Sequence, residues 1–105
     1  MSFKALFIAH APDADPEKHH SLIETGKYKL YTYIVKSQDE AIRVSRKLYE
    51  EDKIESVLLC PGFTHRDVAE IFEALDRKVA VCVSRGDGPS SMITGPILQR
   101  EFFGK

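Results

Sequence analysis

The stretch that most constrains this fold covers residues 57–72, VLLCPGFTHRDVAEIF, and combines an apolar run, a turn and a helix start. The apolar run is too short for a helix and is closed by Pro61-Gly62, which predicts a buried strand followed by a tight turn. Gly62 permits a sharp turn or a positive φ there. Thr64 is a preferred N-cap residue, and apolar side chains recur at helical spacing over 68–75. We therefore expect a strand, a turn and a capped helix, with free backbone N–H groups beside the turn.

Segments typical of strands alternate with segments typical of helices along the rest of the chain. The predicted strands are 3–9, 28–35, 57–60 and 79–83, and the predicted helices are 16–25, 38–52 and 64–77. This alternation predicts a layered α/β domain with a mainly parallel, four-stranded sheet. Because crossovers between parallel strands are right-handed, the favoured strand order is 2-1-3-4, as in flavodoxin-like and Rossmann-like sheets.

This strand order leaves one face of the predicted sheet with little cover. Helices 38–52 and 64–77 share one face, whereas the other face has only the short helix 16–25. The tail at 89–105 carries several large apolar side chains but no clear pattern of secondary structure. Parallel sheets are normally covered on both faces. We therefore expect the apolar C-terminal tail to pack on the sheet or on a partner subunit.

Length and composition narrow the class of protein. A chain of 105 residues favours a single domain over 1–105. The net charge is −1, from 15 basic and 16 acidic residues, so we expect no binding to nucleic acid or to an anionic membrane surface. The apolar runs are too short for a membrane span, and the first residues do not form a signal-peptide pattern. Two cysteines without a disulfide spacing pattern favour free thiols and a cytoplasmic location.

Two parts of the chain resemble a known family. The segment ALFI at 5–8 leads into APDADPEKH at 11–19, and CPGF at 60–63 precedes the capped helix. These segments resemble a family of small prokaryotic proteins known only as a domain of unknown function, and the resemblance covers most of the chain. It implies a one-domain cytoplasmic α/β protein without an assigned activity and without catalytic residues to carry over.

Polar side chains gather where the predicted strands end. Ligands of open α/β sheets bind beyond the carboxyl ends of the strands, near the switch in strand order. The candidate ligand-binding residues at this edge are Gly62, Thr64, His65 and Arg85. N–H groups at a helix start attract anions, and an arginine can hold a carboxylate or phosphate. We therefore expect a small anionic ligand, with the alternative that Thr64 is only a cap and Arg85 only a surface partner of Asp87.

Cys60 and His10 are the candidate catalytic residues. Cys60 ends a buried strand near a helix N-terminus, where a thiolate is stabilised, and His10 ends the neighbouring strand, where it can act as a base. The alternative is that Cys60 fills space in the core and His10 bonds to loop backbone. Cys82, between two valines, has the pattern of a packing residue.

The same residues give no signature of a bound metal or cofactor. The histidines and cysteines lack the spacing of a zinc site. Neither the turn at Gly62 nor the loop at 84–89 forms a P-loop or a dinucleotide fingerprint. We therefore expect no metal and no cofactor.

Two classes of function are compatible with these patterns. The first is a protein that binds a small anionic molecule at the carboxyl ends of the strands. The second is a non-catalytic, oligomeric module with a structural or regulatory role. A homo-oligomer is expected because strand 79–83 is apolar yet lies at a sheet edge, and because the tail adds apolar surface.

Overall fold

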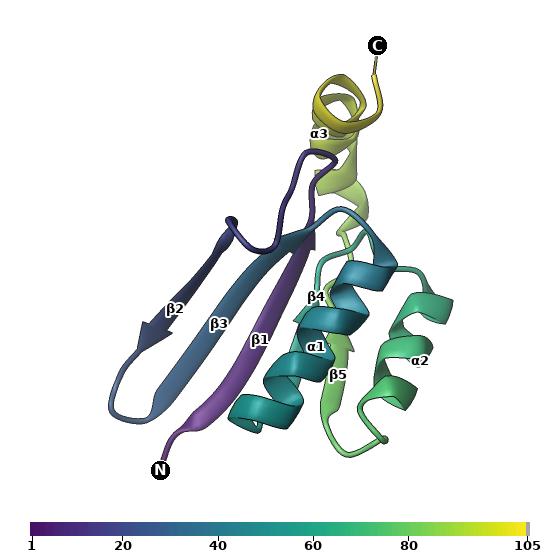
Figure 1. Cartoon of the computed structure of the whole chain (residues 1–105). Helices are drawn as coiled ribbons and strands as arrows, with labels where there is room; N and C mark the ends of the chain where they lie inside the picture. Colours follow the sequence, from purple (N-terminus) through teal and green to yellow (C-terminus); the bar gives the residue numbers. More distant parts are fainter. Residues whose placement is uncertain (105) are drawn as a thin grey trace.

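The computed structural model describes residues 1–104 and has five strands, three α-helices and a terminal π-helical turn (Figure 1). In chain order these are β1 (Phe3–His10), β2 (His20–Glu24), β3 (Tyr28–Val35), α1 (Gln38–Asp52), β4 (Ser56–Leu59), α2 (His65–Ala74), β5 (Ala80–Val83), α3 (Gly88–Leu98) and η1 (Gln99–Phe103). The α/β class expected from the sequence is therefore confirmed.

The strands form one mixed sheet in the order β2-β3-β1-β4-β5. β1 pairs in parallel with β3 and β4, and β4 pairs in parallel with β5. The four predicted strands thus lie in the predicted order, and β1 is central and next to β4, the strand predicted at 57–60. The prediction of four strands is wrong, because β2 adds a fifth, antiparallel strand at one edge.

β2 occupies the segment in which a helix was predicted, at 16–25. The Asp15-Pro16 pair forms a single turn in which the Asp15 carbonyl accepts hydrogen bonds from the Lys18 and His19 N–H groups at 2.9 and 2.8 Å. The chain then extends and pairs with β3. Thr25 closes the hairpin, since its hydroxyl accepts hydrogen bonds from the next N–H groups at 27 and 28. Long-range pairing with β3 therefore overrides the local helix signal.

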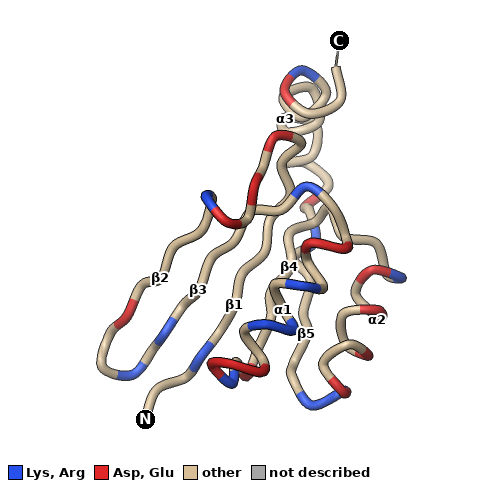
Figure 2. The backbone as a smooth tube through the Cα atoms, in the orientation of Figure 1, with Lys and Arg blue, Asp and Glu red and all other residues tan. Residues whose placement is uncertain are grey.

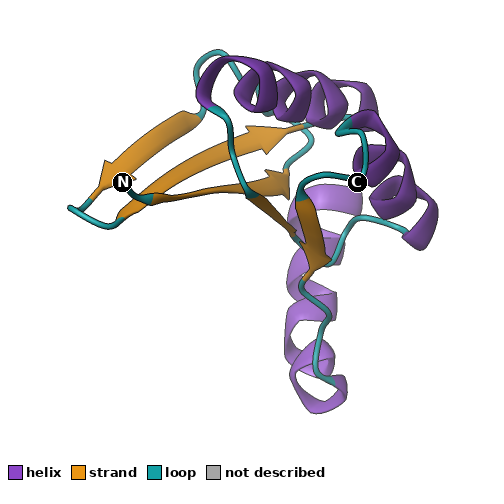
Figure 3. Cartoon of the chain, turned by 90° about the horizontal axis from the view of Figure 1, so that it is seen from below, coloured by secondary structure: helices purple, strands orange, loops and turns teal. Residues whose placement is uncertain are grey.

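Helices α1 and α2 cover one face of the sheet (Figures 1 and 3). Ser37 caps α1 by accepting a hydrogen bond from the Glu40 N–H, and Thr64 caps α2. The apolar stripes of both helices face the alternate strand residues that point the same way, and together they form the core. Its fully buried members include Leu6, Ile8, Val35, Val57, Leu59, Phe63, Ile71 and Leu75.

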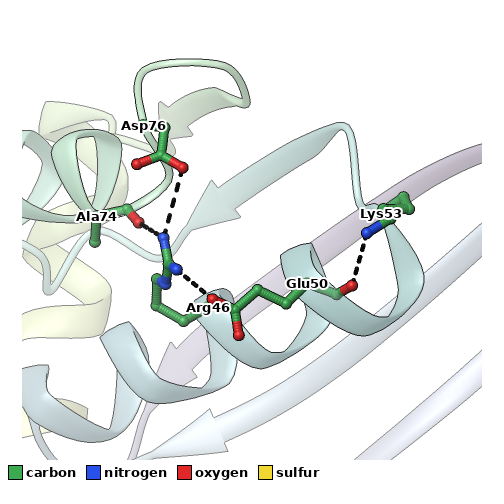
Figure 4. Close-up of polar contacts among 5 residues, drawn as sticks. All are labelled: Arg46, Glu50, Lys53, Ala74 and Asp76. Carbon is green, nitrogen blue, oxygen red and sulfur yellow. Dashed lines mark hydrogen bonds and ion pairs between the residues drawn. The ribbon is translucent and has the colours of Figure 1, made fainter.

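Arg46 links the two helices on the outside of this layer (Figure 4). Its guanidinium donates to the Ala74 carbonyl at the end of α2 and lies 3.7 Å from the Asp76 carboxylate. It also pairs with Glu50 one turn along α1. Lys53 ends α1 in a left-handed conformation, with φ 60°, and its ammonium donates to the Glu50 carbonyl. The contacts of Arg46 with Ala74 and Asp76 therefore join α1 to the end of α2.

The opposite face of the sheet carries no helix from residues 1–104 (Figure 3). α3 and η1 lie beyond the carboxyl ends of the strands, and α3 extends to the side of the sheet away from α1 and α2. Neither element has a buried residue. Cys82 is exposed on this face, so the packing role predicted for it is wrong, whereas the predicted free thiols are confirmed.

Candidate functional site

A pocket of about 510 Å³ lies where β1 and β4 end, between the strand ends and the C-terminal tail. The carboxyl-end segments contribute His10, Lys36, Cys60 and Gly62, and the tail contributes Leu98, Phe102 and Phe103. The lining is largely apolar, with one lysine and one histidine. This volume and apolar lining fall in the range of small-molecule pockets of other proteins.

The strand ends bring His10 and Cys60 to the same edge of the sheet. His10 is the last residue of β1, and the Cys60 N–H donates to the Ile8 carbonyl at 3.0 Å, which extends the pairing of β4 with β1. The Phe63 N–H then donates to the Cys60 carbonyl at 3.2 Å and closes a tight turn over Pro61-Gly62. The end of β1 therefore brings His10 to the pocket, and the predicted strand–turn–helix brings Cys60.

Gly62 is favoured at this turn by close contacts and not by its backbone conformation. No glycine in residues 1–104 has a positive φ. A Cβ added at Gly62 would lie 3.1 Å from Nδ1 of His10 and 3.6 Å from Sγ of Cys60. The first distance is tighter than an ordinary van der Waals contact. Gly62 thus lets the imidazole and the thiol approach the turn closely.

The surroundings of His10 favour its neutral form. Its ring stacks on the fully buried Phe63 ring, with centroids 4.0 Å apart and an angle of 20° between the planes. Burial lowers the pKa of His10 below its usual value, and the negative charge of Asp67 opposes this effect in part. A neutral imidazole at the pocket wall can accept a proton or a hydrogen bond.

Cys60 and His10 are neighbours, with Sγ 4.0 Å from Nδ1. A neutral imidazole beside a thiol can take its proton and leave a nucleophilic thiolate. The separation is long for that transfer, which needs a shorter contact. The two predicted catalytic candidates are therefore brought together in a half-buried pair on one side of the pocket.

The residues at the start of α2 use their polar groups within the helix cap. The Thr64 hydroxyl accepts a hydrogen bond from the Asp67 N–H at 3.0 Å, and the Asp67 carboxylate accepts one from the Thr64 N–H at 2.9 Å. This capping box satisfies two of the N–H groups expected to face a ligand. His65 is exposed as the first residue of α2, and neither His65 nor Thr64 lines the pocket.

Arg85 acts on the backbone of the turn. Its guanidinium donates to the Phe63 carbonyl at 3.0 Å and to the Pro61 carbonyl at 3.3 Å. Arg85 therefore ties the segment after β5 to the turn after β4, on the outside of the pocket wall. Of the four predicted ligand-binding residues, only Gly62 lines the pocket.

The sequence analysis did not identify Lys36 or the tail residues as part of the site. Lys36 follows the last residue of β3, and the Ala11 N–H donates to the Val35 carbonyl at 2.9 Å, which brings the ends of β1 and β3 together. Its position after a neighbouring strand was a usable signal. Phe102 and Phe103 had no such signal, because their place depends on how the tail turns back after α3.

Within residues 1–104, no cluster of three or more histidine, cysteine or acidic side chains is arranged to hold a metal ion. The helices of this same part of the chain are also too short or too polar to cross a membrane.

Residues 3–92 match the family of unknown function DUF6506. The chain belongs to this family. The match includes the strand ends and the turn at 60–63, and it stops within α3, before Leu98 and the two tail phenylalanines. Neither a curated protein nor a solved structure matches the chain.

Proposed function

We propose that this DUF6506 protein binds a small molecule with an acidic group and an apolar body in the pocket at the carboxyl ends of β1 and β4. The observation that carries the proposal is the composition of that pocket. Its walls are mostly apolar, and Lys36 is the one residue of the lining with a permanent charge. An apolar cavity with a single cation selects an amphipathic anion over a fully polar one.

The location of the pocket supports the same proposal. It lies at the switch in strand order, where β1 has neighbours on both sides and the chain crosses between them. Open α/β sheets commonly bind ligands at such a position. Burial lowers the pKa of His10 and so favours its neutral form, which can accept or donate one hydrogen bond to the ligand without adding charge.

Lys36 is the residue that pairs with the acidic group of the ligand. Among residues 1–104, the Lys36 ammonium makes no ion pair and no hydrogen bond, although its backbone N–H donates to Glu40. Thr64 and Arg85, the residues expected to hold an anion, already have partners in the cap and the turn. The anion therefore sits near the end of β3 and away from the start of α2.

Octanoate and its uncharged analogue 1-octanol test this proposal by thermal-shift and calorimetric titration. Octanoate should bind and raise the melting temperature, because ligand binding to the native state stabilises it. Lys36→Gln should weaken octanoate binding about fivefold and leave 1-octanol binding unchanged, since a partly exposed ion pair contributes up to roughly 1 kcal/mol.

Lys78→Gln is the matched control, because Lys78 is an exposed lysine in the turn after α2, outside the pocket lining. It should bind both compounds as the wild type does. Equal loss of octanoate binding in both lysine variants would show that the loss comes from the overall charge of the protein, and it would contradict the role of Lys36. No octanoate binding by the wild type at millimolar concentration would refute the proposal.

A further inference from the structure

The face of the sheet opposite α1 and α2 is an apolar surface without cover. Strand side chains alternate between faces, and the pairing register puts Phe3, Phe7, Ile23, Leu30, Ile34 and Leu58 on this uncovered side. Leu58 is 42% exposed and Ile23 is 59% exposed. We call this surface the open face. A sheet whose central strands are parallel normally has both faces covered, so the open face is incomplete as it stands.

α3 supplies a second exposed apolar surface next to the open face. Met92 is 80% exposed and Ile93 is 69% exposed, and no residue of α3 is buried. α3 lies beyond the strand ends and extends to the side of the open face, so the two surfaces form a corner (Figure 3). The chain therefore presents two adjoining apolar surfaces that its own residues 1–104 leave exposed.

The chain exposes more surface than a typical monomer of this mass. The accessible surface is 7057 Å², whereas a folded 11.9-kDa monomer exposes about 6,000 Å². The excess of roughly 1,000 Å² is comparable with the ~800 Å² that each partner contributes to a stable protein interface. The radius of gyration, 14.3 Å, also exceeds the ~13 Å of a compact chain of this length.

The charge distribution identifies the kind of partner. The pairing register puts no charged strand residue on the open face. Figure 2 shows that α3 also contains no charged residue between Gly88 and Leu98. A charged partner would lose solvation at this corner without gaining an ion pair. A second copy of this chain presents the same uncharged, apolar corner and is self-complementary under a two-fold axis.

We propose that two copies of the chain form a dimer in which the open face and α3 of each copy cover those of the other. Pairing through the β5 edge would leave the open face exposed, so the edge strand is not the main contact. The dimer does not depend on ligand binding at the strand-end pocket, and its test uses no ligand.

The first measurement is the mass in solution by sedimentation equilibrium at micromolar concentration. The wild type should have twice the monomer mass. Leu58→Glu and Ile93→Glu should each raise the dimer dissociation constant roughly a hundredfold or more, because an unpaired carboxylate is strongly disfavoured in an apolar interface. If either variant dimerises as the wild type does, the proposed corner is not the interface.

Ile23→Glu and Leu22→Glu form a matched pair for the open face. The two residues are adjacent on β2 and similarly exposed, at 59% and 46%, but they point to opposite faces of the sheet. Ile23→Glu should weaken the dimer and Leu22→Glu should not. Equal effects of the two substitutions, or none from Ile23→Glu, would overturn the assignment of the face.

Cys82 provides a readout in the unmutated protein, because its thiol is exposed on the open face of the single chain. In the dimer it should react with iodoacetamide at least tenfold more slowly than in the Leu58→Glu variant. The circular dichroism of that variant shows whether the fold is retained. A wild type that is monomeric, with Cys82 reacting as fast as in the variant, would overturn the dimer.

Discussion

The two faces of the sheet carry similar apolar side chains in very different surroundings. Along β4, Val57 and Leu59 are fully buried beneath the helices, whereas Leu58 between them is 42% exposed. All three residues are apolar, so their side-chain type does not explain the difference in exposure. The difference arises because α1 and α2 cover only one face of the sheet. An apolar strand run thus shows that both faces can be buried without showing what buries them.

The helices show which face the chain can cover by itself. α1 and α2 have an apolar stripe on one side and charged residues on the other, as a helix needs between a core and water. α3 has no charged residue and no buried one, and its only polar side chains are the hydroxyls of Ser90, Ser91 and Thr94. The chain therefore supplies two amphipathic helices for one face, and beside the other face an uncharged helix that leaves Met92 and Ile93 exposed.

The largest expected effect compares Leu59→Ala with Leu58→Ala on the same strand. Leu59→Ala should lower the free energy of unfolding by about 2–5 kcal/mol, because it leaves a cavity beneath the helices. Leu58→Ala should cost less than about 0.5 kcal/mol in the monomer, as for a surface position. Urea denaturation at low protein concentration measures both values.

The same pair separates the two faces further when the protein concentration is raised. The loss caused by Leu58→Ala should grow with concentration, because the wild-type dimer becomes more stable by mass action. The loss caused by Leu59→Ala should be nearly constant. A concentration-independent difference between Leu58→Ala and wild type would contradict burial of the open face in a dimer.

The second prediction compares the N-caps of the covering helix α2 and the uncovered helix α3. Thr64→Ala should lower the free energy of unfolding by about 1 kcal/mol, because it breaks the capping box with Asp67. Asp87, the N-cap of α3, makes no side-chain cap hydrogen bond, so Asp87→Ala should cost less than about 0.5 kcal/mol. Equal losses in urea denaturation would show that α3 contributes to the cooperative fold as α2 does.

The parts of the fold that were predicted from the sequence have local signals. The turn at Pro61-Gly62 and the cap at Thr64 are encoded within a few residues, and the structure has both where they were expected. The start of the helix at 38–52 also follows from its N-terminal residues, Ser37 and Glu40. These signals depend on backbone hydrogen bonds that close inside one segment, so tertiary contacts change them little.

The prediction for 16–25 failed because its deciding contacts are distant. Asp15-Pro16 and Gly26 have the pattern of helix ends, but this segment pairs with β3 along the sheet edge and Gly26 lies in a hairpin. Leu22 and Ile23 are too few to give a helical stripe. The adjacent hairpin residues Thr25 and Gly26 were the available signal for a strand.

The residues of the candidate site were likewise predicted only in part. His10, Cys60 and Gly62 were expected together because parallel strands end at one edge, and they line one pocket. Thr64 and Arg85 were placed near that edge, but only the structure shows that their polar groups bond to the cap and the turn. Phe102 and Phe103 reach the pocket through the packing of the tail, which no short sequence pattern specifies.

The smallest expected effect concerns His10, whose side chain follows Leu6 and Ile8 on the covered face and packs on Phe63. Burial lowers the pKa of His10 in the folded protein, whereas the unfolded chain has the ordinary value of about 6.5. At pH values between these two, the unfolded state binds more protons than the folded state. Stability from this residue is therefore complete above about pH 6.5 and is lost as the pH falls through the lowered pKa.

His10→Gln removes this titration, so the variant should lose less stability than the wild type between pH 7.5 and pH 5.5 in urea denaturation. His65→Gln is the control, because His65 is an exposed histidine on α2 outside the pocket, and it should follow the wild-type profile. Carboxylates contribute almost equally to the pH dependence of stability in both proteins, so most of their contribution cancels when the wild type is compared with His10→Gln. A resonance of His10 that titrates at or above pH 6.5 in the folded protein would show that the covered face does not exclude water from this ring, and the pH dependence would then have another origin.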